Sequence, residues 1–320
     1  MIVRLGYVAI SNKLGNKVTT SRTVTYKTYQ KIESPKAKLE KLLKTIELNL
    51  NDLKRILIYN KYSNIHFYRI TSKLFPLSTH PEVGYYGHRE IFKEKYIEIG
   101  DIIKNNSMRV DTHPDQFNVI NSTNAEVVKN TIKNLMEHVN FFEDIGYDDG
   151  KMVIHVGGAV GGKEEGINRF INNFNNFPDK IKKRIILEND DKIYNIKDIL
   201  CICKELKIPM VLDVHHHNCN KEEDILGNYL GEIFYTWNKE RLVPKIHFSS
   251  PREFENDRKH SDYISASDFN EFLYIAKKFD RDFDVMLECK EKDMALIQLV
   301  EDLKEINKEI IWIDESTLKL

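Results

Sequence analysis

Residues 184–217 read RIILENDDKIYNIKDILCICKELKIPMVLDVHHH, and this stretch contains the pattern that decides the fold. Two short apolar runs, Arg184 to Asn189 and Met210 to Val214, flank a segment whose apolar residues recur at helical spacing. Both runs end in polar residues, the first at Glu188 and the second at Asp213. A strand, a helix and a second strand in this order predict a parallel β-α-β unit.

The same unit recurs along the chain. Short apolar and β-branched runs predict eight strands, at Val3 to Ala9, His66 to Ile70, Met108 to His113, Met152 to Val156, Arg184 to Asn189, Met210 to Val214, Lys245 to Ser249 and Asp284 to Cys289. Helical patterns lie between them, among them residues 35–60, 88–106, 124–146 and 266–279. Helix starts carry capping residues, which we place at Ser34, at Asn124 and at Ser267 or Asp268.

Eight alternating units predict an α/β protein with a (β/α)₈ TIM barrel, which uses about 250 residues. A doubly wound open sheet shares this alternation. The barrel is favoured because polar side chains stand at the ends of nearly all strands, and because no GxGxxG motif follows the first strand. The longest linkers, residues 11–33, 71–87 and 251–265, also fall on that face. We expect one domain over residues 1–320.

Composition is that of an ordinary globular protein, with 41% hydrophobic and 30% charged residues. The first ten residues lack the features of a secretory signal, and no apolar stretch has the length of a membrane helix. Four cysteines without a CxxC pair are expected to be free thiols. These features predict a cytoplasmic protein without a membrane partner. A net charge of −1 means that any DNA contact must come from a local basic face.

Metal-type ligands follow the predicted strands. Seven consecutive units end in an imidazole or a carboxylate, at His80, His113, His155, Glu188, Asp213 with His216, His247, and Glu288. One histidine at a strand end is more often a core or surface residue, but seven in register indicate a cluster. A carboxylate directly after a buried apolar run is costly unless it is paired or coordinated.

Mixed imidazole and carboxylate ligands suit Mn²⁺, Zn²⁺ or Fe²⁺ better than Mg²⁺ or Ca²⁺. This many ligands can hold two or three ions. Two ions about 3.5 to 4 Å apart promote phosphoryl displacement, so the pattern predicts phosphodiester hydrolysis.

Three residues near the cluster leave alternatives open. Of the triple His215-His216-His217, only one or two side chains can face the site, and we choose His216. Lys245 shares a strand face with His247, where its ammonium would be repelled unless it contacts phosphate, is neutral or is carbamylated. A solvent-exposed Lys245 is an equal alternative. Asp111 is a candidate to accept a hydrogen bond from a metal-ligating side chain.

The motifs RLGYV, FYRI, STHP, HPDQF, HVGGA, LENDDK, DVHHH and KIHFSS together resemble those of the UV damage endonucleases, from about Val3 to Glu288. The resemblance implies a metal-nuclease barrel similar to that of the abasic-site endonucleases. Members incise damaged double-stranded DNA immediately 5′ to UV photoproducts and other distorting lesions, and leave a 3′-hydroxyl. We expect a nucleoid-associated monomer without an organic cofactor.

Site residues follow from the same resemblance. It places metal ligands at His113, His155, Glu188, Asp213, His216, His247, His260 and Glu288, and reaction-centre residues at His80, Glu188 and Lys245. The expected ions are two or three Mn²⁺, with Zn²⁺ or Mg²⁺ as alternatives.

The resemblance assigns lesion probing to Gln116 and Phe117, where we would expect tyrosine in place of Phe117. An aromatic face and an amide can replace stacking and pairing where damaged bases leave the duplex. Tyr7 and Asn12 are further candidates for DNA contact. Backbone contacts are expected from basic residues of the mouth loops, namely Lys13, Lys17, Arg22, Lys27, Arg252, Arg258 and Lys259.

Three other functions fit parts of this pattern. An abasic-site endonuclease would share the fold and metals. A metal-dependent sugar isomerase or epimerase would also hold ions at strand ends, but its loops would enclose a small substrate. A non-catalytic DNA-binding barrel would have no need of so many buried ligands.

Overall fold

The computed structural model describes residues 1–15, 17–221 and 225–320. Eight strands run parallel, each pairs with the next, and β8 pairs with β1, so the sheet closes. The strands are β1 (Ile2–Val8), β2 (Phe67–Ile70), β3 (Arg109–Thr112), β4 (Lys151–Ile154), β5 (Ile185–Glu188), β6 (Met210–Asp213), β7 (Lys245–Phe248) and β8 (Phe283–Leu287). The predicted (β/α)₈ barrel is confirmed, and each predicted strand overlaps an observed one.

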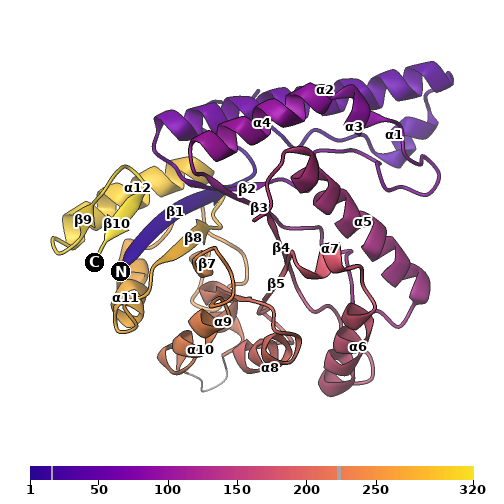
Figure 1. Ribbon diagram of the computed structural model, residues 1–320. Helices are drawn as coiled ribbons and strands as arrows, with labels where there is room; N and C mark the ends of the chain where they lie inside the picture. Colours follow the sequence, from indigo (N-terminus) through magenta and orange to yellow (C-terminus); the bar gives the residue numbers. More distant parts are fainter. Residues whose placement is uncertain (16, 222–224) are drawn as a thin grey trace.

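Helices surround the barrel (Figure 1). They are α1 (Tyr26–Gln30), α2 (Pro35–Tyr62), α3 (His88–Ile91), α4 (Lys93–Asn105), α5 (Ala125–Asp144), α6 (Lys163–Asn175), α7 (Asp179–Lys182), α8 (Ile196–Leu206), α9 (Val214–Cys219), the 3₁₀ helix η1 (Leu226–Asn228), α10 (Leu230–Tyr235), α11 (Ala266–Lys277) and α12 (Lys292–Ile306). Among the described residues, no helix has both the length and the apolar character needed to cross a bilayer.

Two of the three predicted helix caps are confirmed. The Ser34 and Asn124 side chains accept hydrogen bonds from the first turns of α2 and α5. The third prediction, Ser267 or Asp268, is wrong, because α11 is capped by Ser265, whose side chain accepts from the Asp268 N–H. The earlier serine already has the extended backbone that an N-cap requires, so the other two residues lie in the first turn.

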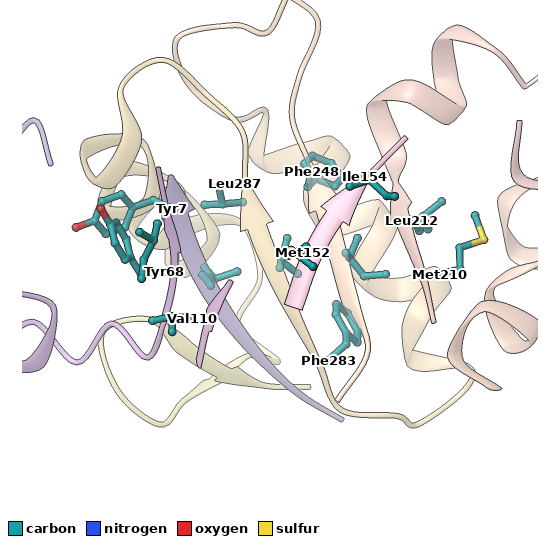
Figure 2. Packing of buried hydrophobic residues seen from close by; sticks show 14 of the residues in the cluster. Tyr7, Tyr68, Val110, Met152, Ile154, Met210, Leu212, Phe248, Phe283 and Leu287 are labelled. Carbon is teal, nitrogen blue, oxygen red and sulfur yellow. The ribbon is translucent and has the colours of Figure 1, made fainter. Parts of the chain in front are cut away.

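The two faces of each strand have different surroundings. One set of alternating residues packs outward against the helices in a large apolar cluster, and Figure 2 shows members such as Met152, Ile154 and Leu212. The other set points into the barrel, where only small apolar clusters form, for example around Phe67 and Met286. The barrel interior is therefore largely polar.

Ion pairs occupy this interior. At the N-terminal end of the strands, Asp284 binds both Arg4, at 2.6 and 2.7 Å, and Arg109, at 2.8 Å. The Arg109 guanidinium lies between the rings of Phe67 and Trp237 at 5.0 and 5.2 Å from their centroids. Nearer the C-terminal ends, a second set of charged residues forms the candidate site.

A C-terminal hairpin, β9 (Ile311–Trp312) and β10 (Thr317–Lys319), was not predicted from the sequence. β10 pairs antiparallel with the first half of β1, whereas β2 pairs only with the second half, from Gly6 to Val8. The hairpin thus completes the edge of β1 that β2 leaves open. It also brings the two ends of the chain side by side, as Figure 1 shows.

We expect Asp284→Ala to lower the free energy of unfolding by about 3 to 5 kcal/mol, because it leaves the buried Arg109 guanidinium without its carboxylate. Urea unfolding followed by circular dichroism measures this loss. Asp101→Ala is the control, since it removes only an exposed pair with Lys104 and should cost less than about 1 kcal/mol. Equal losses in the two variants would contradict the structural role of Asp284.

Candidate metal centre

Glu188, the last residue of β5, lies at the centre of the ligand cluster and is 1% exposed. Its Oε2 is 3.1 Å from His113 Nε2 and 3.4 Å from His155 Nε2. Its Oε1 is 2.8 Å from His247 Nδ1. Because β3, β4 and β7 deliver these rings from different sides of the barrel, both carboxylate oxygens face imidazoles.

Asp213 and His216 form a second part of the cluster. Asp213 ends β6 and caps α9, with Oδ1 accepting the His216 N–H at 2.7 Å. Its other oxygen, Oδ2, is buried without a hydrogen-bond partner among the described residues and lies 3.7 Å from His216 Nδ1. His216 is the member of the histidine triple that lies beside Glu188. A buried carboxylate oxygen without a donor suits a cation.

Glu288 follows β8 and forms the third part. Its Oε1 is 3.1 Å from His247 Nδ1 and also accepts a hydrogen bond from Arg69. His260 Nδ1 donates to the Glu288 backbone carbonyl at 2.5 Å, which fixes the ring beside the cluster. His260 is nevertheless absent from the tight ligand groups found among the described residues.

Three groups could each hold a metal ion, and all three share Glu188. They are His113, His155 and Glu188; Glu188, Asp213 and His216; and Glu188, His247 and Glu288. In each group the ligand atoms lie within 4.8 Å of one another. The donor set, the shared carboxylate and the unpartnered Asp213 oxygen fit divalent ions of the kind that bind nitrogen and oxygen together.

Electrostatics within the cluster are strongly perturbed. Burial lowers the pKa of His247 to about 4. Burial also acts to lower the pKa of His216, but the Asp213 and Glu188 carboxylates outweigh it and raise this pKa to about 9. Burial would raise the pKa of Glu188, yet the neighbouring histidines hold it well below its ordinary value. The carboxylates thus favour a charged ring at His216, whereas burial favours a neutral ring at His247.

Lys245 lies beneath the cluster rather than in solvent. The alternative of an exposed lysine is wrong, because the side chain is fully buried and Nζ is 2.5 Å from Asp111 Oδ2. Burial lowers the pKa of Lys245 to about 8. Asp111 therefore pairs with this ammonium, and among the described residues it forms no hydrogen bond with a histidine of the cluster. His80 is also outside the three ligand groups, and its ring stacks on Tyr26 at 4.1 Å.

The residues assigned to DNA differ in accessibility. Gln116 is exposed, and Phe117 is 75% exposed in the loop after β3. Asn12 is half-buried at the mouth, where its backbone N–H donates to Asp293 and its amide to Glu291. Tyr7 is fully buried on the helix-facing side of β1, and its hydroxyl donates to Asn60. The structure thus brings Gln116 and Phe117 to the surface but leaves Tyr7 in the core.

Two of the basic mouth residues are engaged in contacts within the chain. Arg22 binds Asp52 at 2.7 Å, and Arg258 lies 3.3 Å from Asp191. The others form no ion pair with a described residue and are exposed, namely Lys13, Lys17, Lys27, Arg252 and Lys259. These five residues can contact phosphate without first losing a partner.

Open hollows adjoin the cluster. One of about 480 Å³ is lined by Arg69, Lys73, His113, Gln116, Phe117 and Glu288, among others. A second, of about 590 Å³, lies beside it, with His80 and Phe117 on its walls. A third, of about 310 Å³, is lined by His113, His155 and His216. The surface around the cluster is therefore a connected open face rather than an enclosed pocket.

Sequence reasoning missed Arg69, although its motif FYRI was noted. The residue follows Phe67 by two positions, so the strand period already directed it into the barrel at the mouth end. Asp293 was also missed. This buried carboxylate at the start of α12 accepts hydrogen bonds from Ser11, Asn12 and Lys13, and it anchors the first mouth loop.

Comparison with known proteins gives consistent matches. The family model described as UV-endonuclease UvdE matches residues 3–318. A curated UV DNA damage endonuclease of Bacillus cereus is 39% identical over 320 residues, which cover all of both chains. The crystal structure of SacUVDE superposes with a TM-score of 0.85 and 34% identity, covering 96% of this chain and 99% of the other.

A more distant likeness concerns the fold alone. The 3-keto-D-glucoside 4-epimerase YcjR of E. coli has a TM-score of 0.55 at 12% identity, covering 79% of this chain and 94% of its own. A barrel of this shape therefore also occurs in a sugar epimerase, and fold similarity does not choose between the two chemistries.

Proposed function

The chain belongs to the UV-endonuclease UvdE family, and from this premise we propose that it cuts damaged double-stranded DNA immediately 5′ to UV photoproducts and some other distorting lesions. The cut leaves a 3′-hydroxyl and depends on two or three divalent ions at the C-terminal mouth, with Mn²⁺ as the expected ion. The observation that carries the proposal is the convergence of three candidate ligand groups on Glu188. The full-length relative supports UV-damaged DNA as the substrate.

In the proposed centre, Glu188 would help to hold the ions, because it belongs to all three candidate groups. His113 and His155 complete one group, Asp213 and His216 a second, and His247 and Glu288 a third. His260 would add a ligand through Nε2, since its Nδ1 is already bound to the Glu288 carbonyl. When bound there, divalent ions supply hydroxide near neutral pH and balance negative charge on the reacting phosphate.

The reaction is a hydrolysis. A water oxygen forms a bond to phosphorus, the bond from phosphorus to the 3′-oxygen breaks, and a water proton ends on that oxygen as the 3′-hydroxyl. The phosphate stays on the lesion side of the cut. The chain's residues hold the reacting phosphate and the water in line, which is the main protein contribution to such displacements.

Lesion recognition is proposed for the loop after β3. Phe117 and Gln116 project from the mouth beside the cluster, so an exposed aromatic ring and an amide can enter the duplex where damaged bases unstack. The five unpaired basic residues of the mouth loops are proposed to hold the backbone. Such an open basic mouth suits a long polyanion better than a sugar.

Four further assignments rest on the resemblance. His80 is proposed to contact DNA from the wall of the larger hollow, and Lys245 to stabilise negative charge from beneath His247. Asn12 is proposed to contact DNA at the rim of the barrel mouth. Tyr7 would reach DNA only if its hydrogen bond to Asn60 opened.

The direct test incubates the protein and Mn²⁺ with an end-labelled duplex that carries one cyclobutane dimer. Parallel reactions contain an undamaged duplex and a duplex with an abasic site. We expect one cut, next to the dimer on its 5′ side, which EDTA abolishes and added Mn²⁺ restores. Cutting at the abasic site alone would favour the abasic-site endonuclease, and cutting that persists in EDTA would contradict metal dependence.

A further inference from the structure

Arg69 occupies the side of the barrel mouth that carries no candidate ligand. The ligands come from β3 to β8 and the segments that follow them, whereas β1 contributes none. Arg69, at the mouth end of β2, lies opposite Val8 of β1 and reaches across this strand to Glu288, which follows β8. It is therefore a half-buried cation on the side of the mouth that the carboxylate and imidazole side chains leave open.

The surroundings of Arg69 mark the position of the substrate. The hollow of about 480 Å³ that it lines has the ligands His113 and Glu288 on one side and the lesion-probing residues Gln116 and Phe117 on the other. If the cut bond is next to the lesion, the reacting phosphate must lie between the cluster and these probing residues. Arg69 faces that space.

The Arg69 guanidinium has more N–H donors than its contact with Glu288 uses. Its side chain is 15% exposed, and among the described residues its only hydrogen bond runs to Glu288. A guanidinium carries five N–H donors in a planar fork that matches two phosphate oxygens. One contact to Glu288 thus leaves an edge of the fork for a ligand in the hollow.

We propose that Arg69 is a catalytic residue that binds the non-bridging oxygens of the scissile phosphate and stabilises the charge that builds on them during displacement. This inference rests on the function proposed above and extends it to a residue from β2. An arginine is suited to this task because it stays charged and can bind two oxygens at once. Lys73, exposed on the same hollow, supplies a weaker point charge.

The alternative is that Arg69 only holds Glu288 in place for the metal. The two roles differ in what they change. A phosphate ligand affects DNA binding without metal and the reaction rate at saturating Mn²⁺. A residue that only positions Glu288 affects Mn²⁺ affinity, and excess Mn²⁺ would correct its loss.

The test compares Arg69→Ala and Arg69→Lys with the wild type and with Arg281→Ala, a control whose arginine binds Asn238 far from the hollow. At saturating Mn²⁺, single-turnover cutting of the dimer duplex should fall about 100-fold or more in Arg69→Ala. Added guanidinium should restore part of this rate, and Arg69→Lys should be intermediate. Calorimetry measures Mn²⁺ affinity, so that the cutting rates are compared with every variant saturated.

Two further measurements test the contact between Arg69 and the phosphate. The first measures DNA binding without cutting, and the second depends on the non-bridging oxygen itself. In EDTA, the dependence of dimer-duplex affinity on salt should lose about one unit of logarithmic slope in Arg69→Ala, as expected for one lost phosphate contact. Sulfur in place of one non-bridging oxygen at the cut site should slow the wild type more than Arg69→Ala. Arg281→Ala should match the wild type throughout.

Three outcomes would overturn the inference. Recovery of the full rate of Arg69→Ala at high Mn²⁺ would make Arg69 a positioning residue for Glu288. An unchanged rate and salt slope would exclude a phosphate contact. An unchanged thio effect would place the guanidinium elsewhere. Failure of the wild type to cut the dimer duplex would instead refute the proposed function, and the salt slope in EDTA would still test the phosphate contact.

Discussion

Replacing Glu188 with glutamine is expected to reduce cutting of dimer-containing DNA by about 1,000-fold or more and to remove most of the bound Mn²⁺. The reason is that one carboxylate belongs to all three candidate ligand groups, so a neutral amide weakens every one of them. Glutamine keeps the size of the side chain, so packing beside the surrounding histidines is retained. The effect should therefore be electrostatic rather than structural.

Single-turnover cutting of an end-labelled duplex measures the rate, and calorimetry measures Mn²⁺ binding. Thermal unfolding checks that the variant is folded. Glu240→Gln is the matched control, since Glu240 is also an acid paired with a buried cation, Lys151, but lies at the other end of the barrel. A Glu188→Gln protein that binds Mn²⁺ and cuts as the wild type does would refute the proposed role of Glu188 in metal binding.

Local sequence was sufficient to predict the strands and the ring of polar side chains at their ends. In β5, an apolar run leads directly into Glu188, and in β6 another leads into Asp213, because each strand is buried on both faces until it reaches the mouth. The strand period then places both side chains inside the barrel. Such information lies within a few residues, so single-sequence reasoning can use it.

Contacts between distant strands were harder to predict. Lys245 shares a face with His247, but its partner Asp111 comes from β3, on the far side of the closed sheet. The pair of Arg69 and Glu288 likewise depends on β2 and β8 lying on either side of β1. Only closure of the barrel determines these distances, and the sequence pattern carries the order of strands rather than their register.

Two further differences between the predictions from sequence and the structure have local causes. Tyr7 shares the strand parity of Val3 and Leu5, so it faces the helices, and attention to this alternation would have placed it in the core. The C-terminal hairpin has strands of two and three residues, too short to show a period. Its stability comes from pairing with β1 at the opposite end of the chain.

The double variant Gln116→Ala with Phe117→Ala is expected to lose selectivity for damaged DNA while it retains bound Mn²⁺. Stacking of an aromatic ring on a base is worth about 1 to 3 kcal/mol, so the preference for the dimer duplex over undamaged DNA should fall by about 10- to 100-fold. Metal binding should persist because both residues lie outside the three ligand groups. Competition binding with the two duplexes and Mn²⁺ calorimetry measure these effects.

Single variants separate the two contributions. Phe117→Tyr should keep selectivity, since stacking needs the ring and not a hydroxyl, whereas Phe117→Ala alone should lose most of it. Tyr235→Ala is the matched control, because Tyr235 is 74% exposed, as Phe117 is 75% exposed, but lies on α10, away from the mouth. Selectivity that survives the double substitution would mean that the enzyme recognises a deformable duplex through its backbone contacts. In that case the exposed ring would not be the basis of recognition. Damaged and intact DNA would instead differ in the salt dependence of their binding.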